Sequence, residues 1–81
     1  MAPVRLTELE PGRRGRLTAA DNGEAVPLRL RELGFVAGTE VSIVRRGALG
    51  DPVEIELRGY RISVRGRDLE GLRVVPVDGH A

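Results

Sequence analysis

The chain has 81 residues with 13 basic and 12 acidic side chains, so it can form one small domain with a net charge of +1. It has no cysteine, which excludes disulfides, thiolate metal sites and cysteine nucleophiles. Every basic residue is arginine, and the balanced charge argues against a large nucleic-acid footprint. The sequence shows neither a signal peptide nor an uncharged run of ~20 residues that would span a membrane, and we therefore expect a soluble cytoplasmic protein.

The first third of the chain predicts an extended start, a strand and a turn. Residues 4–12 read as an extended segment that ends in a tight turn, with Leu6 and Leu9 as core anchors. Residues 15–20 are the first strand candidate, and the Asp-Asn-Gly sequence at 21–23 is typical of a turn.

A short helix is predicted over residues 26–33. Its apolar residues are spaced by four and three and form one stripe, made of Val26, Leu30 and Leu33. Pro27 is tolerated only in the first turn. Gly34 is expected to end the helix in the left-handed conformation, with Phe35 packing on Leu30 as in a Schellman motif. A helix of this length is unstable alone and must pack on the sheet through the stripe.

Beyond the helix the sequence predicts a turn, a strand, a connector and a last strand, besides a hairpin. A type II turn at 36–39 leads into a strand over 40–46, in which Val41 and Ile43 share a face. Residues 66–71 form a connector with room for one helical turn and with Leu69 pointing inward. Residues 72–77 form a last strand, and Pro76 places it at a sheet edge.

Residues 53–57 and 60–65 predict a hairpin that turns at Arg58-Gly59. A two-residue turn there pairs Leu57 with Tyr60, Ile55 with Ile62 and Val53 with Val64, which places every apolar side chain, including that of Tyr60, on the core face. The other face then has Glu56 opposite Arg61 and Glu54 opposite Ser63. Because Arg-Gly is a weaker turn signal than Asn-Gly, a bulge at this turn is the alternative.

About five short strands and one small helix predict an all-β fold, a small SH3-like barrel in which few strand edges are exposed. The pattern alone leaves an OB-type barrel open. The whole chain, residues 1–81, is expected to be one domain, with its core over 4–77 and a tail over 78–81.

The chain offers little for catalysis. The only histidine, His80, lies in the tail, and neither a phosphate-binding loop nor a dinucleotide fingerprint is present. Ser42 and Ser63 lie on predicted strands away from any histidine base. We therefore expect no enzyme activity, no cofactor and no metal site, although remote carboxylates that folding brings together would still suit a hard cation.

The charged residues of the predicted hairpin have a structural explanation. Glu54 and Glu56 lie near Arg61 and Arg65, in a pattern typical of cross-strand ion pairs. Nucleic-acid binding is the alternative, because the arginines at 13, 14, 16, 45, 46, 58, 61, 65 and 67 would line a groove. Such surfaces usually add exposed aromatic side chains, and Tyr60, the one candidate, is predicted to face the core. A solvated surface of mixed charge is therefore favoured.

The loop between the second and third predicted strands contains Leu49, Gly50, Asp51 and Pro52. Pro52 disfavours the helical region for Asp51, and Gly50 allows backbone angles that a side chain would forbid. The Asp51 carboxylate is expected to organise the loop by accepting backbone N–H bonds. Leu49 is an apolar residue on a polar loop, which leaves two alternatives open: a contact site for a partner, or a lid folded back on the barrel.

Several short motifs together resemble one family. They are Leu6-x-x-Leu9 with Gly12, Arg29-Leu30-x-x-Leu33-Gly34-Phe35, Gly38-Thr39-x-Val41, Leu49-Gly50-Asp51-Pro52, Arg58-Gly59, and Val64-Arg65 with Asp68. Each motif is weak alone, but their order and spacing over residues 4–77 resemble the ferrous iron transport protein A (FeoA) family.

The resemblance implies an SH3-like barrel with a cytoplasmic accessory role in ferrous iron uptake. The implied partner is the FeoB-type membrane transporter, which carries a cytoplasmic GTP-binding domain; it implies no iron binding or GTP hydrolysis by this chain. We predict that the partner binds the helix together with the loop at residues 48–52. The predicted contact residues are Arg29, Arg31, Leu49, Gly50 and Asp51. Nucleic-acid binding through arginines and iron sensing through carboxylates are the alternatives.

Overall fold

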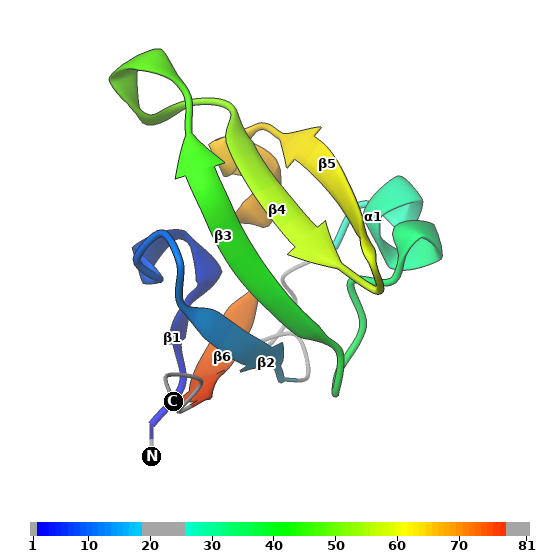
Figure 1. Cartoon of the computed structure of the whole chain (residues 1–81). Coiled ribbons are helices and arrows are strands. Elements are labelled where there is room, and N and C mark those ends of the chain that lie inside the picture. Colours follow the sequence, from blue (N-terminus) through cyan, green and yellow to red (C-terminus); the bar gives the residue numbers. More distant parts are fainter. Residues whose placement is uncertain (1, 19–25, 78–81) are drawn as a thin grey trace.

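The fold, taken from a computed structural model that describes residues 2–18 and 26–77, is a curved antiparallel sheet (Figure 1). In this part of the chain the strands are β1 (Val4–Arg5), β2 (Arg14–Leu17), β3 (Glu40–Arg46), β4 (Val53–Leu57), β5 (Tyr60–Val64) and β6 (Arg73–Val77). The six strands lie in the order β1-β6-β2-β3-β4-β5. They are connected by the helix α1 (Leu28–Leu33) and by 3₁₀ turns η1 (Leu6–Glu8), η2 (Ala48–Gly50) and η3 (Gly66–Leu69).

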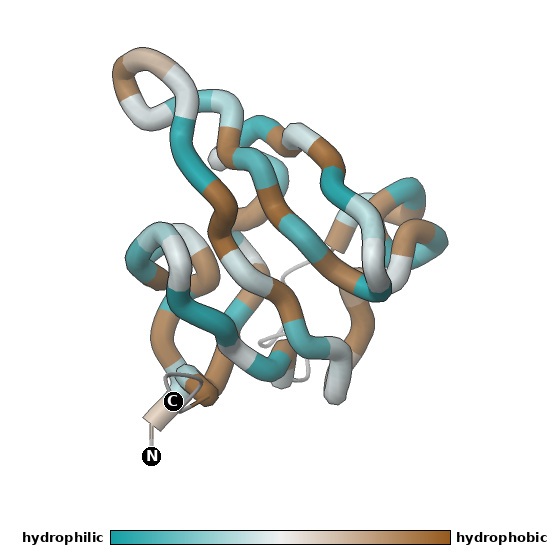
Figure 2. The backbone as a smooth tube through the Cα atoms, viewed as in Figure 1, coloured by the Kyte–Doolittle hydropathy of each residue, from teal (hydrophilic) through white to brown (hydrophobic). Residues whose placement is uncertain are grey.

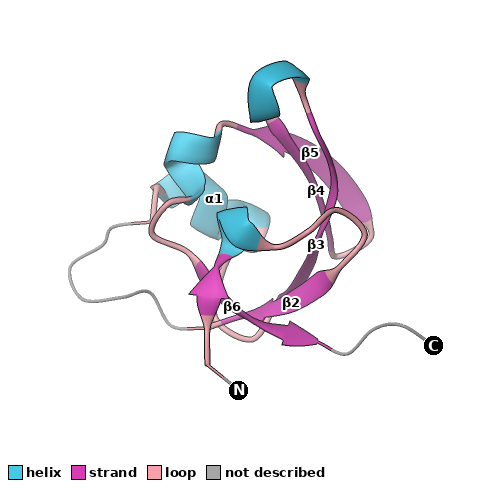
Figure 3. Ribbon diagram, turned by 90° about the vertical axis from the view of Figure 1, so that its left-hand side faces the viewer, coloured by secondary structure: helices cyan, strands magenta, loops and turns pink. Residues whose placement is uncertain are grey.

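The sheet has one strand more than the sequence predicted. The extra strand is β1, which is too short, at two residues, to show an alternating pattern. The predicted turn at 21–23, the end of the first predicted strand at 19–20 and the tail with His80 lie outside the described residues. Figure 3 shows the strands curving around a centre, with α1 on the side that they leave open.

The predicted β4–β5 hairpin is confirmed residue for residue. Leu57 pairs with Tyr60, Ile55 with Ile62 and Val53 with Val64. Arg58 and Gly59 have φ values of 50° and 85°, as a type I′ turn requires, and no bulge interrupts the register. The core position predicted for Tyr60 is wrong: the side chain is 37% exposed, because β5 lies at the sheet edge, and its hydroxyl donates to the Leu33 carbonyl.

A bulge interrupts the pairing of β3 with β4. Ile43 lies opposite Ile55, but the next pair is Arg45 with Glu54, so Val44 is the extra residue. Simple alternation along β3 would turn Arg45 to the same face as Val41 and Ile43. The bulge reverses the phase, so that Arg45 is exposed while Arg46, opposite Val53, turns toward the protein.

The edge position predicted for the last strand is wrong, because β6 lies between β1 and β2. β1 pairs only with Arg73 and Val74, so the half of β6 that contains Pro76 has a neighbouring strand, β2, on one side alone. Proline has no backbone N–H, and it is tolerated here because no strand on the other side needs that donor. On that side Pro76 lies opposite Gly15, where an added Cβ atom would lie 2.8 Å from the Val74 Cβ atom. Only glycine allows β2 to approach β6 so closely.

The helix α1 begins two residues later than predicted, after Pro27. Its end is as predicted: Gly34 has a φ of 117°, and the N–H groups of Phe35 and Gly34 donate to the carbonyls of Leu30 and Arg31, the pattern of a Schellman motif. Of the predicted stripe, Leu30 is fully buried and Val26 packs against the core. Leu33 lies at the rim, 36% exposed, because the helix ends beside the open edge of the sheet.

The core combines one face of the sheet with residues from the helix and the turns. Apolar and polar residues alternate along the strands, as the colours of Figure 2 show. The buried apolar residues are Leu6, Leu9, Leu17, Leu30, Phe35, Val41, Ile43, Val53, Ile55, Leu57, Val64, Leu69, Leu72 and Val74. Leu6, Leu9 and Leu69 are inside, as predicted.

Candidate interaction surface

The connection between β3 and β4 is a loop that projects from the sheet (Figure 1). The Gly47 N–H donates to the Pro52 carbonyl at 2.8 Å and closes its base. The Gly50 N–H donates to the Gly47 carbonyl at 2.9 Å and folds the tip into a 3₁₀ turn. The peptide bond between Asp51 and Pro52 is cis. These contacts give residues 47–52 a defined backbone conformation, as the sequence predicted from Gly50 and Pro52.

Leu49 lies at the tip of this loop and points into solvent. Its exposure is 105% of that of a reference residue, so the lid alternative is wrong. Its φ of 61° falls in the left-handed region, which costs a residue with a side chain about 1–2 kcal/mol. Neither the exposure nor the backbone conformation of Leu49 stabilises the fold, and both fit a side chain that contacts another molecule.

The Asp51 carboxylate ties the loop to the end of β5. One oxygen accepts the Gly66 N–H at 2.7 Å, and the other accepts the Arg65 guanidinium at 3.2 Å. The N–H bond from Gly66 is the main reason that the pKa of Asp51 is lowered; desolvation opposes the shift, and Arg65 and Arg67 add to it. The predicted role of Asp51 as an acceptor of backbone N–H bonds is confirmed, but its partner lies across the fold rather than within the loop.

The two helix arginines of the predicted site differ in their contacts. The Arg29 guanidinium pairs with the Asp68 carboxylate on η3 at 2.6 Å and remains 63% exposed. Arg31 is exposed, and no ion pair of Arg31 is found within residues 2–18 and 26–77. Arg29 therefore links α1 to η3 through an exposed ion pair.

The structure does not bring the helix and the loop directly together. In Figure 1 the loop projects at the upper left and α1 lies on the right, near the opposite end of the β4–β5 hairpin. The segment from Arg65 to Asp68 lies between them: it bonds Asp51 at one end and Arg29 at the other. The predicted residues thus form two regions joined by η3, with a hollow between Asp51, Arg65 and Arg67.

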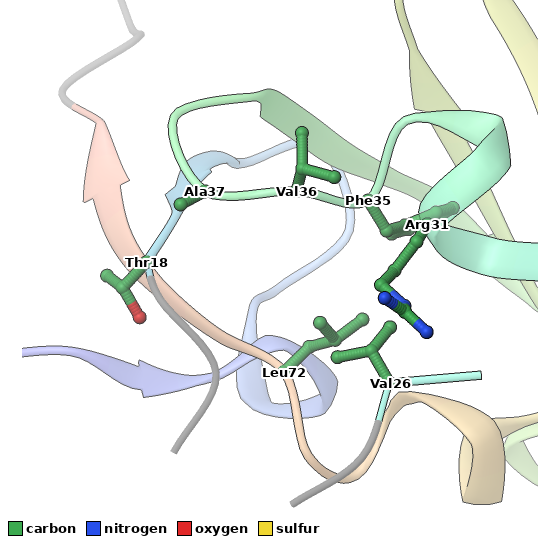
Figure 4. A pocket seen from close by; sticks show the side chains of 7 residues that line it. All are labelled: Thr18, Val26, Arg31, Phe35, Val36, Ala37 and Leu72. Carbon is green, nitrogen blue, oxygen red and sulfur yellow. The ribbon is translucent and has the colours of Figure 1, made fainter. Parts of the chain in front are cut away.

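A cavity beside the helix, of about 190 Å³, was not predicted from the sequence (Figure 4). One of the residues that line it lies on the helix and the others lie in loops and turns: Thr18, Val26, Arg31, Phe35, Val36, Ala37 and Leu72. In Figure 4 the Arg31 side chain extends from the helix toward Val26. No sequence motif marks the cavity, because its lining residues are far apart along the chain.

The outer face of the sheet carries alternating charges. Arg14 and Arg16 approach Glu40, and Arg45 and Arg61 approach Glu54. Four of the nine arginines that the nucleic-acid alternative names are thus paired with acids beside them. The described residues contain no group of three or more histidine, cysteine, aspartate or glutamate side chains that could hold a metal ion.

Comparison with known proteins identifies the family. The FeoA domain matches residues 4–76, nearly the whole chain. This chain belongs to the FeoA family. FeoA proteins are accessory proteins of ferrous iron transport and are not enzymes. The described part of this FeoA chain has no helix long and apolar enough to cross a membrane.

Three relatives place the chain within the family. It is 28% identical over 78 residues to a fusion of Fe(2+) transport protein A with the Fe(2+) transporter FeoB from Porphyromonas gingivalis; the match covers 96% of this chain and 9% of that protein. The FeoA of Chlorobium tepidum has a TM-score of 0.80 and 33% identity, covering 96% of this chain and 74% of the other. The FeoA of Stenotrophomonas maltophilia, an SH3 domain protein in complex with zinc, has a TM-score of 0.72 and 28% identity, with 91% and 89% coverage. The SH3-like fold predicted from the sequence is confirmed.

Proposed function

We propose that this chain regulates ferrous iron uptake by binding the cytoplasmic GTP-binding part of a FeoB-type membrane transporter. The observation that carries the proposal is the Porphyromonas gingivalis relative, in which a FeoA sequence and FeoB are one polypeptide. Fusion raises the effective concentration of one part near the other, which favours a contact between them. The proposal places this chain in the cytoplasm.

The loop with Leu49 at its tip is the proposed contact. Burying a leucine side chain stabilises a complex by about 1.5–3 kcal/mol, and here that side chain is fully exposed before binding. Asp51 holds the base of the loop against Gly66, so less ordering is needed when the partner binds. Arg29 and Arg31 on α1 form a second region that would contact an acidic surface of the transporter.

The surface charges favour this function over nucleic-acid binding. A nucleic-acid groove needs arginines that are free to replace counterions on phosphates. The arginines on the outer face of the sheet are instead paired with Glu40, Glu54 and Glu56. Among the described residues no three histidine, cysteine, aspartate or glutamate side chains lie together as a metal site, which disfavours the iron-sensing alternative.

The test measures ferrous iron uptake with and without this protein, together with co-purification with the transporter. Normal uptake and no association would end the proposal. For the surface, Leu49→Ser is expected to weaken binding to the GTP-binding part by roughly tenfold or more, with no loss of stability, since the side chain packs on nothing. Ala48→Ser, on the same exposed loop, is the matched control and should bind as the unchanged protein does.

If Leu49→Ser and Ala48→Ser bind equally well, the loop is not the contact. Arg31→Ala then tests the helix region, because that change removes an exposed charge without breaking the pair between Arg29 and Asp68.

A further inference from the structure

We propose that the free edge of β5 pairs with β5 of a second copy of this chain, antiparallel and around a two-fold axis. β5 is the last strand in the sheet order and has a neighbour, β4, on one side only. This inference concerns self-association and does not depend on the transporter proposal.

The hairpin geometry decides which backbone groups face outward. In a two-residue hairpin the flanking residues, here Leu57 and Tyr60, exchange hydrogen bonds, and the pattern then alternates along the strand. Tyr60, Ile62 and Val64 therefore bond to β4, while the N–H and C=O groups of Arg61 and Ser63 face away. Within the described residues, no backbone bond from a loop, cap or turn reaches either of them. The edge thus presents two donors and two acceptors.

The side chains select one register for a symmetric pair. With the two-fold axis at Ile62, Arg61 lies opposite Ser63 of the second copy, and four backbone hydrogen bonds form. An axis at Arg61 would set two arginines directly opposite each other. An axis at Ser63 would set Arg61 opposite Arg65. Like charges in opposite positions are destabilising, so only the Ile62-centred register avoids the repulsion.

Apolar side chains beside the edge would be covered by this pairing. Ile62 packs only partly against the core, and at the axis it would meet its own copy at the close spacing of a non-hydrogen-bonded pair. Tyr60 on β5 and Leu33 at the end of α1 are exposed on the same side of the sheet and lie together, because the Tyr60 hydroxyl donates to the Leu33 carbonyl. A second β5 strand would reduce the water contact of this group.

Electrostatics does not oppose the contact. A charged residue on an edge strand often prevents pairing. Here Arg61 is already compensated by Glu56 at 3.5 Å and Glu54 at 3.9 Å, both on the same chain. The net charge of each copy is only +1, so overall repulsion between copies is small. Four bonds and a small apolar contact fall below a standard stable interface, and we expect a dissociation constant on the order of 10⁻⁴ to 10⁻³ M.

The test is sedimentation equilibrium of the full chain from about 10 µM to about 1 mM, a range that brackets this constant. The mass is expected to rise toward that of two copies. Amide exchange measured on the same samples should slow at Arg61 and Ser63 as the concentration rises. A monomer at every concentration, with unchanged exchange at both amides, overturns the proposal.

Substitutions at Ser63 give opposite expected shifts. The side chain is exposed, so these variants should fold, with Ser63→Glu slightly less stable as a monomer because it faces Glu54 of its own chain. Ser63→Arg sets an arginine opposite Arg61 of the second copy and should weaken the dimer roughly two- to tenfold, whereas Ser63→Glu creates an opposite-charge pair and should strengthen it by a similar factor. Ser63→Ala, which keeps the backbone bonds, should dimerise as the unchanged chain does. A dimer that responds equally to all three variants forms elsewhere and also overturns the proposal.

Discussion

At the scale of single residues, Asp51 connects loop shape to pH. Its pKa lies below the ordinary value of 3.8, chiefly because its carboxylate accepts the Gly66 N–H. A carboxyl whose pKa is lowered by folding contributes stability that is fully present above its ordinary pKa and is lost as the pH falls through the folded value. Asp51 is only partly buried, so the effect is small, but it should be visible as a difference between two variants.

We predict that Asp51→Asn is less stable than the unchanged chain at neutral pH and that the difference disappears in acid. The asparagine has no carboxylate to protonate, and it loses the charged part of the bonds to Gly66 and Arg65. Urea denaturation midpoints from neutral pH to below 3.8 measure the difference. Glu70→Gln, at an exposed position just after η3, controls for the loss of a negative charge. A gap that stays constant with pH would contradict the assignment.

Residue roles were predictable where the partners are local in sequence. The Schellman end of α1 followed from Leu30, Gly34 and Phe35, which lie within six consecutive residues. The Asp51 carboxylate was expected to accept an N–H bond, but Gly66 is 15 residues away, and no local pattern names it. Whether Leu49 pointed outward or folded back depended on the left-handed φ, which composition does not reveal for a leucine.

At the scale of elements, Arg46 joins β3 to the first turn of the chain. Its guanidinium donates to the Thr7 carbonyl at 2.8 Å and to the Leu9 carbonyl at 2.7 Å. These two acceptors follow β1 and flank the end of η1, so one side chain fixes the segment that carries the buried Leu6 and Leu9. The neighbouring Arg45 makes one exposed ion pair with Glu54.

We predict that Arg46→Ala lowers the free energy of unfolding by about 1–3 kcal/mol, since two carbonyls lose a charged donor. Arg45→Ala is the matched control and should change it by no more than about 0.5 kcal/mol, because its side chain is 78% exposed. Denaturant unfolding of both variants decides the matter. Equal losses for the two would mean that Arg46 does not hold the first turn.

The elements show where strand patterns succeed and fail. The β4–β5 register was predictable because a slip by one residue would have exposed every apolar side chain. The place of β6 was not, because Pro76 limits pairing on one side at one position and says nothing about the neighbours of Arg73 and Val74. The cavity beside α1 also escaped prediction, since it depends on how distant segments meet.

At the scale of the molecule, stability should be uneven across the sheet. β3 and β4 have paired neighbours on both sides and carry the buried residues Val41, Ile43, Val53, Ile55 and Leu57. β1 has two residues and one neighbour. The sequence predicted the SH3-like class and the helix, because alternation and turn residues agree along most of the chain. The pairing of β1 with β6 was not predicted, because these strands lie at opposite ends of the chain and no local pattern indicates that they meet.

We predict that amide exchange is slowest in β4 and faster in β1 by at least roughly a hundredfold, because strand ends and edges open without unfolding the centre. Exchange followed by NMR on a dilute sample, where copies of the chain do not meet, measures this order. Protection of the β1 amides equal to that of Ile43 or Ile55 would show instead that the whole sheet opens as one unit.

The bulge at Val44 has a consequence for altering this protein. Since it reverses the phase of β3, the face toward which Arg45 and the 47–52 loop turn depends on whether Val44 bulges or pairs. If Val44 took a regular place in the ladder, Arg45 would turn toward the core; if Val44 were removed, Arg45 would still lie opposite Glu54 and the loop would keep its direction. Transplanting this tip into another barrel therefore requires either keeping the bulge or removing its extra residue.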